Sequence, residues 1–462
     1  MLASIDRRAA LAGIAVSLLP IRAARAQAPS LSGPVELVAR PAPGKLFAGA
    51  ATAADTWAFA GHDGPALLRI RHGDEVVATL RNETTRPLTL HWHGVRGPAA
   101  TDGTGGVSQP AVQPGASFTY RFTPPDSGTY LIRSLVPGAA GEAAGRGLAG
   151  ALIVDERDPP RVDGDHALVV RDWLVEPSGA LGPFGRPEEA ALAGRLGNRI
   201  AVGSGDAPRR LEVAPGARLR LRLLNACNAR IMRVRFDGMK AFVAAVDGQP
   251  TDTFEPLKAS LPFAPGTRYD IVFDMPREPG AKAVVVAQIG QGVPLVEIAT
   301  SQAAPVPDRD PIAALPQNKL LPPEVRLQNA VRRDLTISGG ATRDEAGRVG
   351  YSGDPTKIWR IDGAAGTPGG RPAFTARRGQ PVVLGLVNTT GFVQPMHLHG
   401  YAFRLLHNLD DGWEPYWLDT LQVAEGKTAR IAFVADNPGK WVISSTVLER
   451  FDTGLWTWFE VS

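Results

Sequence analysis

Cysteine is almost absent from this sequence: Cys227 is the only one among 462 residues. A single thiol cannot form a disulfide within the chain, so no disulfide framework is expected. We expect Cys227 to be a small buried apolar side chain instead of a reactive thiol. Long apolar runs are also missing, and after the first residues none reaches the ~20 residues that a membrane-spanning helix needs.

The chain also lacks a strong charge of either sign. Its formal net charge is +4, with 50 Lys and Arg against 46 Asp and Glu. Residues 1–26 hold four arginines and one aspartate, so the remainder is close to neutral. No basic patch stands out, and nucleic acid is therefore not an expected partner.

The first 26 residues have the features of an export signal. The paired arginines Arg7 and Arg8 precede a short apolar run at 9–19, and a small-x-small cleavage site follows at 24–26. Paired arginines are typical of the Tat route, although alanine stands where Tat signals carry a bulky apolar residue, so the Sec route stays open. We expect a periplasmic protein without a transmembrane segment.

The rest of the chain has the pattern of an all-β protein. Glycine (51) and proline (40) are abundant, and short alternating runs lie between turn signals. The stretch 66–94 predicts three strands, interrupted at 72–74 and 84–87. A short helix is expected at 187–197. The fold class is therefore β-sandwiches or barrels.

One motif recurs three times, as "GDEVVATLRNET", "GARLRLRLLNAC" and "GQPVVLGLVNTT". Three copies at long spacing indicate three related β-domains, not a solenoid. We place the domains at 30–160, 161–305 and 331–462, with a proline-rich linker at 306–330.

Four of the eight histidines form two His-x-His pairs. Residues two apart on a strand project from one face, so "HWH" directs His91 and His93 to one point, and "HLH" does the same for His397 and His399. Four imidazoles that meet would suit copper or zinc. The alternative is a hydrogen-bonded, metal-free cluster of neutral histidines. The isolated histidines are expected to be surface or structural residues: His62, His72, His166 and His407.

With these motifs in view, nearly the whole chain resembles the multicopper oxidase family. The resemblance rests on "LHWHGV", "TDGTGG", "GTYLIRS" and "GLAGALIVDE" in the first third, "RLRLLNACNARIMRVRFDG" in the middle, and "QPMHLHGYAFRLL" with "WVISSTVLERFDTGLW" in the last third. It implies three cupredoxin-like Greek-key domains. It also implies a type 1 copper in the third domain and a trinuclear copper cluster between the first and third.

The resemblance also implies that most copper ligands have been lost. His91 and His397 match the two type 2 ligands, and His93 and His399 each match one type 3 ligand. At the type 3 positions of the second and last motifs stand Arg133, Leu135, Ser444 and Thr446. At the type 1 positions stand Gln394, Ser445, Arg450 and Leu455. Without a thiolate at the type 1 position, electrons from a substrate cannot enter, so a working laccase is not expected.

Two further positions concern proton transfer. Asp102 matches a carboxylate that family members use beside the type 2 copper for proton delivery, which makes it a candidate proton donor. Alternatively it is a turn residue of "TDG", or it forms a buried ion pair with Arg133. The family's other relay carboxylate is replaced by Phe451.

Two hypotheses follow. In the first, the chain is an exported, degenerate multicopper-oxidase-like protein that binds one copper ion, or zinc as the alternative, through His91, His93, His397 and His399. A mononuclear metal oxidoreductase activity stays open in this case. In the second, it is a metal-free scaffold or binding protein of the cell envelope, similar in plan to the copper-free division protein FtsP. Its partners would then be cell-envelope or division proteins.

Overall fold

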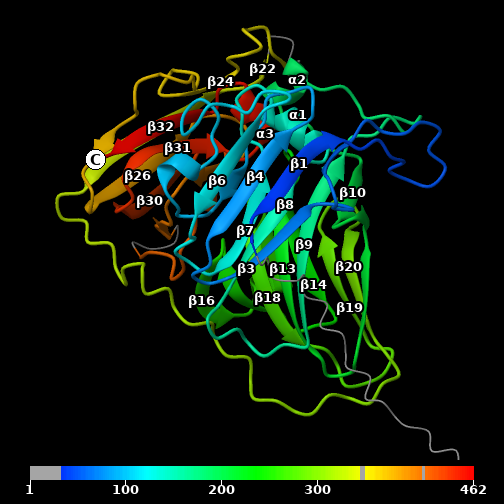
Figure 1. Cartoon of the computed structure of the whole chain (residues 1–462). Helices are drawn as coiled ribbons and strands as arrows, with labels where there is room; N and C mark the ends of the chain where they lie inside the picture. Colours follow the sequence, from blue (N-terminus) through cyan, green and yellow to red (C-terminus); the bar gives the residue numbers. More distant parts are fainter. Residues whose placement is uncertain (1–32, 344–348, 408–411) are drawn as a thin grey trace, which may run out of the picture.

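The computed structural model describes residues 33–343, 349–407 and 412–462, and the expected export signal lies outside them. In this part of the chain strands dominate, which confirms the all-β prediction (Figure 1). The α-helices are short: α1 (Ala140–Gly145), α2 (Pro187–Ala191) and α3 (Leu448–Asp452). No helix among these residues is long and apolar enough to cross a bilayer.

The first third of the chain folds into two four-stranded sheets. One has the order β2 (Trp57–Phe59), β1 (Val35–Pro41), β4 (Val76–Asn82), β6 (Ser117–Phe122). The other has the order β3 (Ala66–Arg71), β8 (Gly150–Asp155), β7 (Gly128–Arg133), β5 (His91–His93). Strands β3, β4 and β5 are the three strands predicted for 66–94.

The middle third contains a seven-stranded and a five-stranded sheet. The larger has the order β11 (Gly205–Asp206), β10 (Arg199–Val202), β9 (Gly164–Trp173), β13 (Arg218–Asn225), β18 (Arg268–Asp274), β15 (Phe242–Val246), β16 (Gln249–Phe254). The smaller has the order β12 (Arg209–Val213), β20 (Val293–Thr300), β19 (Lys282–Ala287), β14 (Met232–Asp237), β17 (Ser260–Phe263). No helix or strand lies in the fully described segment 301–330 that follows.

The last third contains two five-stranded sheets and a small hairpin. One sheet has the order β24 (Trp359–Ile361), β21 (Val331–Gly339), β26 (Gln380–Asn388), β30 (Thr428–Ala435), β28 (Arg404–Leu405). The other has the order β25 (Thr375–Ala376), β32 (Trp456–Val461), β31 (Gly439–Ser445), β27 (Gln394–Leu398), β29 (Thr420–Val423). The hairpin pairs β22 (Thr342–Arg343) with β23 (Val349–Gly350).

The three repeated segments of the sequence form equivalent strands, β4, β13 and β26. Each pairs in parallel with one neighbour (β1, β9, β21) and antiparallel with another (β6, β18, β30). Each ends in an asparagine whose side-chain amide donates to main-chain carbonyls and whose Oδ1 accepts an N–H two residues further on: Asn82, Asn225 and Asn388. The sequence repeat is therefore a repeat of structure, down to the hydrogen bonds of one side chain.

Two local predictions have different outcomes. Cys227 is 2% exposed, and burial raises the pKa of its thiol well above the usual value, so the expected buried role is confirmed. The predicted helix at 187–197 is shorter than expected, because α2 ends at Ala191 and Leu192 leaves the helical region of backbone space. The carbonyl oxygen of Leu192 accepts a hydrogen bond from Arg450, a partner 258 positions away.

The first and last thirds of the chain meet where β5 and β27 lie. His93 of β5 is within hydrogen-bond distance of Thr420 of β29, and His399, just after β27, contacts Asp102 of the first third. These contacts join residues about 300 positions apart. They bring the two His-x-His pairs to one buried point.

Candidate metal centre

Strand pairing fixes the neighbours of both histidine pairs. In β5, His91 lies opposite Arg133 of β7. In β27, His397 lies opposite Ser444 of β31 on one side and opposite Thr420 of β29 on the other. Arg133 in β7 and Ser444 in β31, which the sequence analysis expects to stand at copper-ligand positions, are therefore next to the imidazoles.

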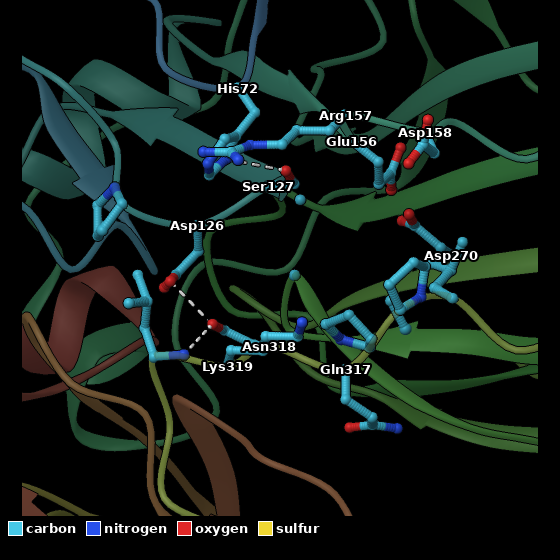
Figure 2. A pocket seen from close by; sticks show the side chains of 18 of the residues that line it. His72, Asp126, Ser127, Glu156, Arg157, Asp158, Asp270, Gln317, Asn318 and Lys319 are labelled. Carbon is cyan, nitrogen blue, oxygen red and sulfur yellow. Dashed lines mark hydrogen bonds between the residues drawn. The ribbon is translucent and has the colours of Figure 1, made fainter.

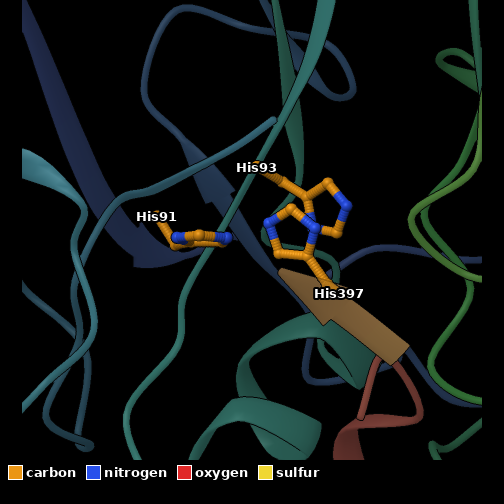
Figure 3. Close-up of side chains that lie close together, drawn as sticks. All are labelled: His91, His93 and His397. Atoms are coloured by element: carbon orange, nitrogen blue, oxygen red, sulfur yellow. The ribbon is translucent and has the colours of Figure 1, made fainter. Parts of the chain in front are cut away.

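The four imidazoles form one compact group, which we call the histidine cluster: His91, His93, His397 and His399. All four residues are at most 1% exposed. The ring centroids of His93 and His397 are 3.6 Å apart and nearly parallel, and His91 lies 5.6 Å from each (Figure 3). His399 lies 4.3 Å from His91 and 4.6 Å from His397. The two His-x-His pairs therefore meet at one place, as the sequence predicts.

Main-chain carbonyls determine the tautomer of two cluster histidines. Nδ1 of His91 is 2.8 Å from the carbonyl oxygen of Asp102, and Nδ1 of His397 is 2.8 Å from that of Asp419. A carbonyl oxygen can only accept, so both Nδ1 atoms carry the proton. In the neutral rings, Nε2 of His91 and Nε2 of His397 therefore each hold a bare lone pair.

Both nitrogens of His93 are occupied by protein groups. The Arg133 guanidinium donates to Nδ1 of His93 over 2.9 Å. Nε2 then carries the proton and donates to the hydroxyl of Thr420 over 2.9 Å. The lone pair of His93 is thus already used.

His399 is occupied in the same way. Its Nδ1 is 3.1 Å from both carboxylate oxygens of Asp102 and donates to them. Its Nε2 is 3.0 Å from the hydroxyl of Ser444, which donates to it. A serine hydroxyl and an arginine thus satisfy the lone pairs of two of the four imidazoles.

The other two lone pairs have no partner. Nε2 of His91 and Nε2 of His397 are fully buried and make no hydrogen bond within the described ranges 33–343, 349–407 and 412–462. An unsatisfied buried polar atom in a native fold calls for an explanation such as an ion or a water. One nitrogen each of His91, His93 and His397 lie within 4.8 Å of one another, a spacing that can hold a metal ion.

Asp102 supports the cluster as a carboxylate. Burial by itself would raise its pKa, but His399 and His91 lower it well below the usual value, and the hydroxyl of Thr104 donates to it over 2.6 Å. A carboxyl group with so low a pKa holds its charge at neutral pH, so it accepts hydrogen bonds here. Arg133 donates to His93 and to the Thr446 carbonyl, so the alternative of an Arg133–Asp102 ion pair is wrong.

A second carboxylate links the cluster to the middle third. Asp419 forms a buried ion pair with Arg268 of β18 and lies 3.3 Å from Nδ1 of His397. Asp247 accepts the main-chain N–H groups of Asp419 and Thr420. Burial, with the charge of Asp419, raises the pKa of Asp247 to about 7. No sequence motif connects Arg268 or Asp247 with the histidines, and only the fold brings them together.

Burial also favours the neutral form of three of the cluster histidines. It lowers the pKa of His399 to about 3, and it lowers the pKa of His397 and that of His93, the latter with the added effect of the charges of His397 and Arg133. Burial and the charge of Arg268 lower the pKa of Arg133 to about 9, so Arg133 is still a cation at neutral pH. Neutral imidazoles keep the lone pairs that a metal ion needs.

A second buried cation lies where α3 follows β31. Arg450 donates to Oε1 of Gln394 over 2.7 Å and to the carbonyls of Val393 and Leu192. Its guanidinium carbon is 4.9 Å from the ring centroid of Trp359. Burial lowers its pKa to about 10, so the side chain is charged. The Arg450 guanidinium donates only to uncharged oxygens, and the Trp359 ring further stabilises its positive charge through a cation–π contact.

The other residues singled out from the sequence are part of the packed interior. Each of the following is at most 1% exposed: Leu135, Ser445, Thr446, Phe451 and Leu455. Oγ of Ser445 accepts the N–H of Val447, which helps to start α3. The four isolated histidines are partly exposed and lie outside the cluster.

A pocket at the junction of the first and middle thirds is a separate candidate. Its cavity volume is about 470 Å³, and Figure 2 shows Asp126, Glu156 and Asp270 among its lining residues, with Asn318 bound to Asp126. These carboxylates are paired with arginines: Asp126 with Arg96, and Glu156 and Asp270 with Arg220. They are therefore not free to hold a metal ion.

The chain matches known proteins over most of its length. Three family profiles described as multicopper oxidase match residues 46–159, 180–304 and 341–462. The multicopper oxidase MmcO of Mycobacterium tuberculosis is 27% identical over 421 residues, which are 82% of this chain and 77% of that protein.

Solved structures agree as well. The multi-copper oxidase of Pseudomonas thermotolerans is 30% identical, with a TM-score of 0.81 over 94% of this chain and all of the other. That of Pseudomonas parafulva is 32% identical, with a TM-score of 0.80 over 93% of this chain and all of the other.

Proposed function

The chain belongs to the multicopper oxidase family, and from this premise we propose that it is an exported member that binds one copper or zinc ion but is not a working laccase. The ion is held by the histidine cluster, whose four side chains, His91, His93, His397 and His399, are the candidate ligands. The free lone pairs of His91 and His397 bind it first, and His93 or His399 would join only by releasing Arg133 or Ser444. Imidazole is a common ligand of both metals.

One observation carries the proposal. In a buried cluster whose other nitrogens are all hydrogen-bonded, Nε2 of His91 and Nε2 of His397 have no partner among the described residues. Leaving a buried acceptor unsatisfied costs about 1–3 kcal/mol, so two such atoms side by side favour a bound species between them. A metal ion bound there would act as a Lewis acid, and Asp102 and Asp419 hold the two rings in the required tautomer through their carbonyl oxygens.

The type 1 position argues against oxidase activity. Ser445 replaces the thiolate, and the charged Arg450 with Gln394 fills the space of the two histidines. A protonated hydroxyl is a poor copper ligand, and a guanidinium beside it repels a further cation. Electron transfer from a substrate thus has no entry point, which supports a role without dioxygen reduction.

The N-terminal 26 residues support export. They carry the paired arginines and the cleavage site of a signal peptide, and we propose a periplasmic location with the Tat route as the path. We likewise propose three cupredoxin-like domains at 30–160, 161–305 and 331–462, joined by a linker at 306–330.

Metal content tests the proposal directly. Full-length protein expressed with its signal and purified without chelators should carry about one equivalent of copper or zinc by mass spectrometry. The double variant His91→Gln/His397→Gln should carry none, because both free lone pairs are removed. His62→Gln is the matched control and should keep the metal, since His62 lies outside the cluster.

Thermal stability is a second readout. An ion that binds only the folded state raises the melting temperature by mass action. The unmodified protein and His62→Gln should therefore gain stability on metal addition, and the double variant should not. Metal-free protein that ignores added Cu(I), Cu(II) and Zn(II) would disprove the proposal.

One observation favours the second candidate, a metal-free scaffold of the cell envelope comparable to FtsP. Arg450 and Arg133 occupy family copper positions with hydrogen-bonded protein groups, as expected of a site turned to structural use. In this case, deletion of the gene would cause an envelope or division defect, and the double variant His91→Gln/His397→Gln would still rescue it. Failure of the rescue would count against the scaffold.

A further inference from the structure

A pocket with a volume of about 630 Å³ lies between α1, α2 and α3, so all three thirds of the chain contribute to it (Figure 1). The apolar side chains in its wall include Phe184, Pro187 and Pro355. Among the described residues that line it there is neither Arg450 nor a histidine of the cluster, so it is separate from the proposed metal centre. A pocket of this size at a junction between domains is a usual place for a small ligand.

Arg195 in the wall of this pocket is a buried cation, and only 3% of the residue is exposed. Its Nε donates to the carbonyl of Pro183 and its Nη2 to that of Gly182, and the guanidinium carbon is 4.3 Å from the ring centroid of Phe184. Within the described part of the chain the guanidinium forms no ion pair, and its Nη1 makes no hydrogen bond. A positive charge and a free N–H donor are therefore available to a ligand.

Other buried arginines show what Arg195 lacks. Arg220 and Arg268 each donate to buried carboxylates of the chain. Burial by itself lowers the pKa of a guanidinium, but these carboxylates raise the pKa of Arg220 and of Arg268 above the usual value, whereas the pKa of Arg195 is lowered. An arginine keeps its charge at neutral pH all the same. A carboxylate carried by a ligand would give Arg195 the partner that the other two have within the chain.

Two of the four carboxylates that line the pocket are ion-paired with arginines. Glu142 pairs with Arg86 and Arg146, and Glu189 lies 3.8 Å from Arg186. The charges of these two groups are thus balanced by cations of the chain, so they do not offset the charge of Arg195.

The other two carboxylates, Glu449 and Asp452, are held by hydrogen bonds from the main chain. Glu449 accepts the N–H of Arg195, and Asp452 accepts three N–H groups at and just before the start of α1. Burial raises the pKa of Glu449 and raises that of Asp452 to about 7, so part of their negative charge is lost near neutral pH. The part that remains disfavours a phosphate dianion more than a carboxylate, because repulsion grows with the charge of the ligand.

We propose that this junction pocket binds a small organic monocarboxylate with an apolar or aromatic body. Nη1 of Arg195 donates to the carboxylate of the ligand, and the apolar wall formed by Phe184, Pro187 and Pro355 contacts its body. The site uses none of the four histidines, so it does not depend on the proposed metal centre.

Calorimetric titration of full-length protein tests the class of ligand. The probes are benzoate and hexanoate, the neutral isostere benzamide, the cation benzylamine, and inorganic phosphate. Benzoate or hexanoate should bind roughly 10-fold more tightly than benzamide or better, because a charge-assisted hydrogen bond is gained. Benzylamine and phosphate should bind more weakly than the carboxylates. Tighter binding of either one, or no binding of both carboxylates, would overturn the proposal.

A variant tests the role of the arginine. Arg195→Gln should weaken benzoate binding by roughly 10-fold or more, because the charged donor is lost. Arg210→Gln replaces an exposed arginine outside the pocket and should bind benzoate as the unmodified protein does. Unchanged benzoate affinity in Arg195→Gln would contradict the site.

Photoaffinity labelling decides the matter on the unmodified protein if Arg195→Gln does not fold. After irradiation with 4-azidobenzoate, mass spectrometry should find the label in peptides that contain residues 184–187 or 355–356. Excess benzoate should suppress this labelling, and excess benzamide should not. Labelling only at other places, or labelling that both compounds suppress equally, would overturn the proposal and leave the proposed metal centre untouched.

Discussion

At the scale of single residues, hydrogen-bond donors satisfy the lone pairs of two of the four imidazoles in the histidine cluster. Arg133 and Ser444 each donate to a ring nitrogen of the cluster, and Arg450 donates to Gln394. These hydrogen bonds hold the rings of His93 and His399 in one orientation, because turning a ring would break its bond to the donor. His91 and His397 are the exceptions, and the proposed function depends on them.

Neutral buried histidines predict a pH dependence of stability. The pKa of His399 is lowered to about 3 in the fold, against the ordinary value of 6.5. Between these values the unfolded chain binds a proton that the folded chain does not, so stability falls as the pH decreases from about 6.5 towards 3. By this linkage His399 alone accounts for up to roughly 5 kcal/mol, and the lowered pKa values of His93 and His397 act in the same direction.

Chemical denaturation of metal-free protein from pH 7.5 to pH 4 measures this effect. The pKa values of Asp247 and Asp452, each raised to about 7, act in the opposite direction, so the test is the difference between two proteins. We expect the stability of the unmodified protein to change less favourably on acidification than that of His399→Gln, which cannot be protonated. An equal slope in both proteins would contradict the assignment to His399.

At the scale of elements, the three repeats share the strand itself and also the asparagine with which the strand ends. Strands β4, β13 and β26 end in an asparagine that ties the following loop to a neighbouring segment. In β26 this loop leads directly into β27, which carries His397. In the closing stretch, β31 is held between β27 and β32 by main-chain pairing, which does not depend on the identity of its side chains.

Substitution of one such asparagine should be costly. Asn388→Ala removes an amide that donates to the carbonyls of Phe392, Val423 and Ala424 and an acceptor for the N–H of Thr390. We expect a loss of about 2–4 kcal/mol, because several buried polar groups lose their partner together.

Denaturation midpoints provide the measurement, and the exposed Glu425 provides the comparison. Glu425→Ala should change stability by no more than about 0.5 kcal/mol. Equal effects of the two substitutions would show that the asparagine is not a fixed part of the repeat.

At the scale of the whole molecule, buried ion pairs connect the thirds of the chain. Arg222 of β13 binds Asp165 and the hydroxyl of Thr129 in β7, which joins the middle third to the first. Arg268 binds Asp419 in the last third and the carbonyl of Thr129. The histidine cluster therefore lies at a junction to which all three thirds contribute.

Removal of Arg268 should weaken that junction. Arg268→Ala leaves the Asp419 carboxylate buried without its cation, which costs about 3–5 kcal/mol. Calorimetry should show a lower melting temperature, and Cu(I) affinity should fall because the Asp419 carbonyl that orients His397 is less well held. The exposed Arg210, whose partner Glu297 is also exposed, is the matched control. A variant with unchanged stability and affinity would contradict the role of this ion pair.

Much of the fold follows from the sequence alone. Alternation with period two, frequent glycine and proline, and the three repeats predict an all-β chain of related domains, since side-chain direction on a strand is a local property. Family membership follows from ordered motifs, and the convergence of His91, His93, His397 and His399 follows from their places in the first and last repeats. The extent of the helix at 187–197 could not be predicted, because the carbonyl of Leu192 faces the distant Arg450.

The sequence by itself therefore determined which residues the histidine cluster contains, and the family resemblance predicts which metal ligands are replaced. Only the tertiary structure decided which ring nitrogens are free, which partner Arg133 has, and that Arg220, Arg222 and Arg268 are buried. The physical reason is that a hydrogen bond or ion pair depends on distances between residues far apart in the chain. Periodicity and motif spacing carry no information about those distances.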